Sequence, residues 1–241
     1  MAGPVPAIHP RSTVRRWPSR FGHDDSAKVA AVYVPAHFKE DRLDVLHEFI
    51  RGSGLATLVS MTADGMIASH APLMLDPDPA PYGTLIGHLA KANPHARVAD
   101  PGVQTLVIFQ GADGYITPSY YAAKREHGKV VPTWNYAAVH AYGTLEVFDD
   151  PVRLLDVVTR LTVRNETPRA QPWAVSDAPA DFVQGMLRGI VGIALPIVRL
   201  EGKVKMSQNR PATDIAGVVE GLRQDGRDDL ADAVVGATGG A

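Results

Sequence analysis

The residues best suited to bind a ligand are concentrated in one stretch, Tyr115–Tyr142. It holds six rings with polar tips in a chain whose aromatic content is only 7%. They are Tyr115, Tyr120, Tyr121, Trp134, Tyr136 and Tyr142, with Thr117, Ser119, Thr133 and Asn135 between them. Such rings supply flat apolar area, while their OH and NH groups fix the orientation of a ligand. The stretch predicts the wall of a binding site, the alternative being an ordinary aromatic core.

A second group of residues is suited to an anion. In Gly87–Pro94, GHLAKANP, the end of a strand runs into a helical turn that carries His88, Lys91 and Asn93. A cation, an amide, an imidazole and free backbone NH groups in one place are what an anion site requires. The segment indicates a phosphate site or, alternatively, a polar corner between a strand and a helix.

Two further polar segments could contribute to a site. Ser69 and His70 interrupt an apolar run before Pro72, so one of them points inward, or the segment forms a bulge at the proline. In a pocket, this strand could offer backbone groups to a flat heteroaromatic ring. The run Ser207–Arg210, which follows Lys203 and Lys205, is of a kind usually solvated, but it could equally reach a phosphate or a partner subunit.

Familiar catalytic and metal motifs are absent. The histidines never show HExxH spacing, there is no GxSxG elbow, and no other zinc pattern emerges. The chain has no cysteine, which excludes disulfides, thiolate nucleophiles and cysteine metal ligands. We therefore expect no metal site, and no residue declares itself catalytic.

The elements that must position these residues are mostly short strands. Leu55–Met61, Met66–Leu75, Thr84–Leu89 and Gln104–Phe109 read as strands, with a hairpin turn at Ala63–Gly65 and another at Gly111–Gly114. The series continues through Trp134–Val139, Ala141–Phe148 and Gly192–Leu200, where Pro196 marks an edge or bulge. No GxGxxG or P-loop motif appears. The pattern predicts a mainly β, α+β fold: an antiparallel barrel with flanking helices.

Composition limits the setting and the domain plan. The net charge of −2 gives no global attraction to nucleic acid or membranes, and no apolar run is long enough to span a membrane. A reducing cytoplasm is the default location. We expect a flexible arm over residues 1–30, a barrel domain over 31–210 and a helical extension over 211–241. The arginines at 11, 15, 16 and 20 leave a nucleic-acid or partner-binding arm as the alternative for the first segment.

The chain resembles the PaiB-like family of FMN-binding negative transcriptional regulators. The matching segments are YVPAHF (33–38), ASHAPL (68–73), GHLAKANP (87–94), YITPSYY (115–121), VPTWNYAAVHAYG (131–143) and KMSQNRP (205–211). They occur in the family's order and cover about residues 32–224. Tyr120 stands where the family usually has Trp, and Lys91 where Arg is common.

The resemblance implies a split β-barrel of the flavin-binding type that works as a homodimer, with FMN near the subunit interface. His88, Leu89, Lys91 and Asn93 would then lie at the phosphate end, and Ser69, His70, Ala71 and Pro72 beside the isoalloxazine ring. Tyr115, Thr117, Thr133, Trp134 and Asn135 would line the ring or ribityl chain, from the same subunit or its partner. Ser207, Gln208 and Asn209 complete the implied cofactor-binding set.

Three functions remain open at this point. The first is an FMN-binding dimer that acts as a transcriptional regulator, although the acidic terminal helices have the wrong sign for a recognition helix meeting DNA. The second is an FMN-dependent oxidoreductase that uses a nicotinamide cofactor or oxygen. The third is a barrel that binds another flat ligand, such as haem or a deazaflavin.

Overall fold

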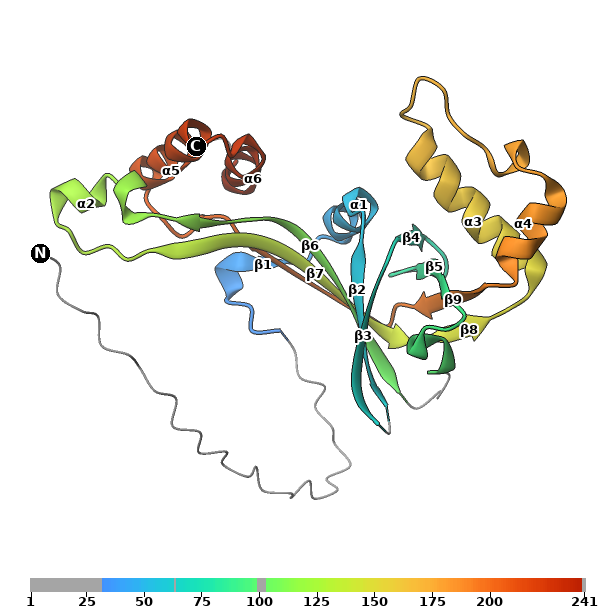
Figure 1. Ribbon diagram of the computed structural model, residues 1–241. Coiled ribbons are helices and arrows are strands. Elements are labelled where there is room, and N and C mark those ends of the chain that lie inside the picture. Colours follow the sequence, from blue (N-terminus) through green and yellow to red (C-terminus); the bar gives the residue numbers. More distant parts are fainter. Residues whose placement is uncertain (1–31, 63, 99–102, 240–241) are drawn as a thin grey trace, which may run out of the picture. The chain divides into compact units, whose positions relative to one another are not determined.

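Two antiparallel sheets and the helices around them make up the described part of the chain (Figure 1). The computed structural model describes residues 32–62, 64–98 and 103–239. The predicted arm, residue 63 in the first predicted turn, residues 99–102 and the last two residues lie outside it.

The first sheet has six strands in the order β1-β10-β7-β6-β2-β3, and the second has four in the order β4-β5-β9-β8. The strands are β1 (Lys39–Glu40), β2 (Ala56–Thr62), β3 (Gly65–Ala71), β4 (Leu73–Asp76), β5 (Thr84–Ala90), β6 (Gln104–Ile116), β7 (Thr133–Thr144), β8 (Glu146–Phe148), β9 (Ile190–Pro196) and β10 (Arg199–Lys205). The α-helices are α1 (Leu43–Gly52), α2 (Ala123–Glu126), α3 (Pro151–Glu166), α4 (Ala180–Leu187), α5 (Ala212–Gln224) and α6 (Asp228–Thr238). Short 3-10 turns are η1 (Ala36–Phe38), η2 (Pro94–Arg97), η3 (Pro118–Tyr120) and η4 (Val175–Asp177).

The two sheets enclose one apolar core, which gives the predicted split barrel. Leu58, Val107 and Val139 point into it from the first sheet, and Leu85 and Ile193 from the second. The chain passes directly from one sheet to the other through single residues, from β3 to β4 and from β7 to β8. Where the sheets meet, a Cβ on Gly143 would lie 2.2 Å from the Pro196 carbonyl oxygen, so only glycine fits there.

Proline placement corrects two strand predictions. Met66–Leu75 is not one strand, because Pro72 separates β3 from β4 and the two belong to different sheets. Gly192–Leu200 is likewise divided after Pro196 into β9 and β10. Proline lacks the NH that a ladder needs, so it marks the points where a strand leaves its sheet.

The turn predicted at Gly111–Gly114 is also wrong. β6 runs unbroken to Ile116, and the register against β7 shifts between Gln110 and Asp113 because β6 carries one extra residue there. This is a β-bulge, and glycine is common both in bulges and in turns, so the sequence does not distinguish the two. The result is a long β6–β7 ribbon whose far end lies beneath α5 and α6 (Figure 1).

A second apolar cluster attaches α5 and α6 to this ribbon. Ile116 and Met206 pack there with Ile215 and Val218 of α5 and Leu230 of α6, all at most 5% exposed. Removing some five large side chains from water stabilises such a junction by several kcal/mol, at about 1.5–3 kcal/mol for each. The ribbon is therefore held rigidly along the face that α5 and α6 cover.

Candidate functional site

One face of the six-stranded sheet carries most of the predicted aromatic wall. Alternation along β7 sends Trp134, Tyr136 and Tyr142 to this face and Asn135 to the other. Tyr115 joins them from β6, its ring centroid 6.2 Å from that of Trp134. We call this surface the open face: the face that carries these four rings and the residues in register with them. Two of the six rings lie elsewhere: Tyr121 is fully buried beneath α5, and Tyr120 packs against α5 from η3.

A shallow hollow of about 520 Å³ lies on the open face. Its lining residues are Ile108, Gln110, Asp113, Trp134, Tyr136, Ala138 and His140. The buried Nδ1 atom of His140 has no hydrogen-bond partner among the described residues. Burial lowers the pKa of His140, with smaller effects from Glu201, which raises it, and Arg199, which lowers it. The hollow therefore combines apolar area, two aromatic rings and a neutral imidazole able to bond to a ligand.

The segment that follows β5 is fixed to the sheet by a buried polar network. His95 is completely buried; its Nδ1 lies 2.8 Å from Ser69 Oγ and its Nε2 3.0 Å from Ser60 Oγ. Ser60 also pairs with Thr105 at 2.7 Å. Asn93 Nδ2 donates to Ser69 Oγ at 3.0 Å, while its Oδ1 accepts from the His95 backbone NH at 2.9 Å. These bonds hold η2 against β2 and β3.

The residues predicted at the phosphate end do not converge in this structure. Lys91 is exposed and follows β5 directly. His88 shares the β5 face of Ile86, which packs against α3, and burial lowers the pKa of His88. Leu89 points into the barrel core, and the Asn93 side chain belongs to the network with His95. Among these four, Lys91 offers its charge to the solvent.

The segment predicted beside the flavin ring lies on an edge strand. β3 ends the order of the six-stranded sheet, so one side of its backbone has no partner strand among the described residues. His70 lies on the open face, with Nδ1 3.0 Å from Thr57 Oγ1. Ala71 is buried in the barrel core, and Pro72 joins β3 to β4. The backbone of an edge strand can donate hydrogen bonds to a planar ligand and accept them from it.

The remaining predicted residues lie at the far end of the ribbon. Thr133 accepts a hydrogen bond from Lys205 Nζ, and Thr117 caps η3 by accepting from the Ser119 NH. Asn135 is buried on the covered face, where its Nδ2 donates to Ser207 Oγ at 2.9 Å. Trp134 and Asn135 therefore point in opposite directions and do not share one surface.

The turn after β10 is closed by its own side chains. Gln208 accepts from the Met206 NH at 2.6 Å and donates to the Val204 carbonyl oxygen at 2.5 Å. Ser207 has a φ of 67°, in the left-handed region, and its bond with Asn135 holds it there. Asn209 is exposed. Ser207 and Gln208 thus have structural partners in this chain.

The predicted site residues form two groups that are separated along the strands of the sheet. His70 is in register with His140 through Thr57 and Ile108, whereas Trp134 lies six residues further along β7. At about 3.3 Å per residue, the two groups are separated by about 20 Å along the strands. One group contains His70, Lys91 and the β3 edge, and the other contains Tyr115 and Trp134.

His95 and Ser60 are the residues that sequence reasoning missed. His95 follows Asn93-Pro94, a start signal for a short helix, and Ser60 interrupts the apolar strand β2. Each is a polar residue where an apolar one would be ordinary. Their pairing could not be read from the chain because the two are 35 residues apart.

Metal and membrane features are not found in the part of the chain that the structure describes. No group of three His, Cys, Asp or Glu side chains there could hold a metal ion. No described helix is both long and apolar enough to cross a membrane.

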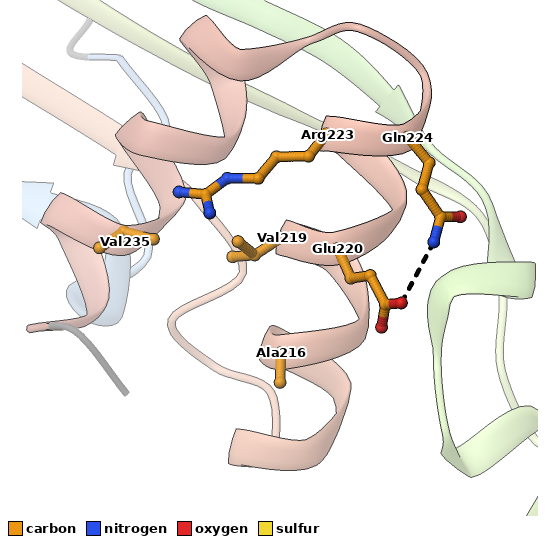
Figure 2. Close-up of a pocket in the computed structure, with 6 residues that line it drawn as sticks. All are labelled: Ala216, Val219, Glu220, Arg223, Gln224 and Val235. Carbon is orange, nitrogen blue, oxygen red and sulfur yellow. Dashed lines mark hydrogen bonds between the residues drawn. The ribbon is translucent and has the colours of Figure 1, made fainter.

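A second hollow, of about 540 Å³, lies between α5 and α6 (Figure 2). Its floor is apolar, with Ala216, Val219 and Val235, and Figure 2 shows Glu220 and Gln224 hydrogen-bonded to each other at its rim, 3.1 Å apart. None of the predicted site residues lines it.

Comparison with known proteins shows which family the chain is similar to. A family model described as "Putative FMN-binding domain" matches residues 32–199, which is most of the chain. The protease synthase and sporulation protein PAI 2 of Bacillus subtilis is 31% identical over 194 residues, covering 80% of this chain and 90% of the relative. An uncharacterised protein of Aspergillus fumigatus is 34% identical over 238 residues, covering 80% and 91%.

Solved structures agree on the fold. The conserved hypothetical protein Rv2991 from Mycobacterium tuberculosis superposes with a TM-score of 0.51 at 15% identity, covering 74% of this chain and 94% of that one. At this identity the likeness concerns the architecture alone.

Proposed function

The chain belongs to the PaiB-like family of FMN-binding proteins, and we propose that it is a homodimer that holds FMN between its two copies and acts as a transcriptional regulator. FMN is the cofactor that the family model names for residues 32–199.

The donor set of the chain fits FMN. The phosphate requires a cation, which the exposed Lys91 would supply. The isoalloxazine requires an apolar platform and a rim of hydrogen-bonding groups, which the β3 edge and the open face supply. The unpartnered Nδ1 of His140 is a further group that a ligand could satisfy.

The observation that carries the dimer is the separation of the two groups of family residues. His70 lies about 20 Å along the strands from Trp134, which is too far for both to contact one flavin ring in a single chain. A second copy packed on the open face in the opposite direction would place the Trp134 of one chain beside the His70 of the other. The face suits such burial, since Trp134 and Tyr115 are 55% and 50% exposed.

Bound FMN would supply reversible two-electron or one-electron chemistry, and the protein would tune its potential through hydrogen bonds. The relatives give no specific support for an oxidoreductase over a regulator. Direct contact with DNA would fall to the arginine-rich segment at 11–20, outside the described residues, because α5 and α6 are rich in Asp and Glu.

The test is flavin binding by purified protein, followed by absorbance and by quenching of FMN fluorescence. We expect Lys91→Ala to lose about tenfold or more in FMN affinity with an unchanged melting temperature, since a charged hydrogen bond is lost. Lys129→Ala, an exposed lysine outside the family segments, is the control and should bind as the wild type does. Equal affinity in both variants would remove Lys91 from the site.

Oligomeric state is measured on the same samples by sedimentation. Ile108→Glu places a charge at the centre of the open face and should give a folded monomer that no longer retains FMN. A monomeric wild type that still binds FMN tightly would refute the shared site. Bleaching of the flavin by NADH or NADPH would favour the oxidoreductase, and salt-dependent retention on DNA the regulator.

A further inference from the structure

Three cations lie at and just after the end of β10, and none of them pairs with a carboxylate in the described part of the chain. Lys203 and Lys205 are two residues apart on the open face, opposite Ala138 and Tyr136 of β7. Arg210 follows after a tight turn in which its NH donates to the Ser207 carbonyl oxygen at 2.9 Å. None of the ion pairs found among the described residues includes any of the three.

The acidic residue next along β10 is already engaged. Glu201 accepts from Arg199 at 2.5 Å and from the Tyr142 hydroxyl at 3.1 Å. The carbonyl oxygens of Tyr33 and Trp134 accept from Lys203 and Lys205 respectively, so oxygen dipoles rather than charges face these ammonium groups.

The cations repel one another. The pKa of Lys205 is lowered first by burial and then by the positive charges of Lys203 and Arg210. A group of like charges without counter-charge costs free energy in the folded protein, and an anion that binds there would remove this cost. Sites that bind anionic ligands have this arrangement.

Aromatic rings surround the same three residues. Lys203 Nζ lies 5.1 Å from the ring centroid of Tyr136 and 5.6 Å from that of Tyr33. Lys205 Nζ lies 5.8 Å from the centroid of Phe38, and the Arg210 guanidinium 4.6 Å from that of Tyr121. The Trp134 carbonyl oxygen accepts from Lys205, and the Trp134 side chain is exposed on the same open face. Rings beside cations suit a ligand with a flat base and a phosphate.

We propose that Lys203, Lys205 and Arg210 form a binding site for the phosphate of a nucleotide, whose base stacks on the exposed aromatic rings of the ribbon. Two sources share this chemistry: the FMN held mainly by the other copy, or a separate nucleotide that meets the flavin. The site is distinct from Lys91 and lies within one chain. The FMN source rests on the proposed dimer, whereas binding of a separate nucleotide can be tested without it.

The experiment is calorimetric titration of adenosine 5′-monophosphate and of inorganic phosphate into FMN-free and FMN-loaded protein at constant ionic strength. We expect the FMN-free wild type to bind both, with adenosine 5′-monophosphate the tighter. Lys205→Met should weaken this binding about tenfold or more, since one charged contact is removed. Lys205→Arg keeps the charge and should restore most of it.

The matched control is Lys39→Met. Lys39 lies on β1 opposite Lys203, but its ammonium pairs with Asp41 at 2.8 Å, so its loss should leave phosphate binding unchanged. Should Lys205→Met fail to fold, Lys203→Met removes a second charge of the same site.

The FMN-loaded protein distinguishes the two sources. Binding of adenosine 5′-monophosphate that persists after loading, and is lost in Lys205→Met, supports a separate nucleotide. Binding that loading abolishes, together with weakened FMN affinity in Lys205→Met, supports the phosphate of FMN itself. The proposal is overturned if the wild type does not bind adenosine 5′-monophosphate, or if Lys205→Met and Lys203→Met bind it as tightly as the wild type does. Failure of FMN binding alone does not overturn it.

Discussion

Replacing His95 by alanine tests whether the buried network holds the segment that carries Lys91. The change removes two hydrogen bonds, to Ser69 and Ser60, each contributing about 1 kcal/mol. It also leaves a space of roughly 60 Å³, which costs about 1.5 kcal/mol at 24 cal/mol per Å³. The expected loss is about 3.5 kcal/mol, a large fraction of the 5–15 kcal/mol typical of a domain.

Urea unfolding followed by circular dichroism measures this loss. His47→Ala is the control, since His47 is partly buried and makes one bond, from Nε2 to the Tyr82 carbonyl oxygen at 3.0 Å. It should cost about 1 kcal/mol. We also expect His95→Ala to weaken FMN binding under conditions where the protein is still folded, because Asn93 and Lys91 lose their anchor. A cost for His95→Ala no greater than that for His47→Ala would refute the reasoning.

Three further predictions concern packing and ionisation. A Cβ on Gly217 would lie 2.1 Å from the Tyr120 carbonyl oxygen, so Gly217→Ala should destabilise the protein by about 1–3 kcal/mol. Gly236 has open space around it, so Gly236→Ala should be neutral or stabilising. Thermal unfolding of the two variants measures both effects. Burial lowers the pKa values of His88, His95 and His140 from 6.5, so the folded state binds fewer protons than the unfolded state. The free energy of unfolding should therefore decrease as pH falls below 6.5, and a melting temperature that does not change below that pH would contradict this. Burial and Asp225 raise the pKa of Tyr120 to about 12, so its contribution to stability is present below pH 10 and is lost as pH rises through about 12. Burial also raises the pKa values of Tyr121 and Tyr142, so in an ultraviolet titration the late phase should be smaller in Tyr120→Phe than in the wild type, and an unchanged phase would contradict the assignment.

The sequence predicted the fold well where one local rule applied. Alternation along Trp134–Tyr142 identifies a strand without knowledge of its neighbours, but the bounds were misplaced: the predicted strands Trp134–Val139 and Ala141–Phe148 are a single β7, Thr133–Thr144, followed by β8. The predictions at Pro72 and Gly111 were wrong because each residue type is found in two kinds of local structure. A proline can mark a bulge or a passage between sheets, and a glycine a turn or a bulge.

The candidate site was predicted as a set of residues rather than as an arrangement. The family segments named His70, Lys91, Trp134 and Asn135, yet only the structure shows that Trp134 and Asn135 face opposite ways. It also shows that His70 and Trp134 are separated by about six residues along the strands. Such facts depend on pairings between strands far apart in the chain. The sequence alone does not encode them in any local pattern.

The bulge between Gln110 and Asp113 has a consequence for how this chain can change in length. Before it, even-numbered residues of β6 face outward with Ile108; after it, odd-numbered ones do, with Tyr115. Deleting a single residue here would turn Tyr115 toward α6 and expose Ile116, which is now fully buried. A deletion or insertion of two residues would preserve both faces. Natural variation and engineering in this ribbon should therefore tolerate changes in pairs and reject single ones.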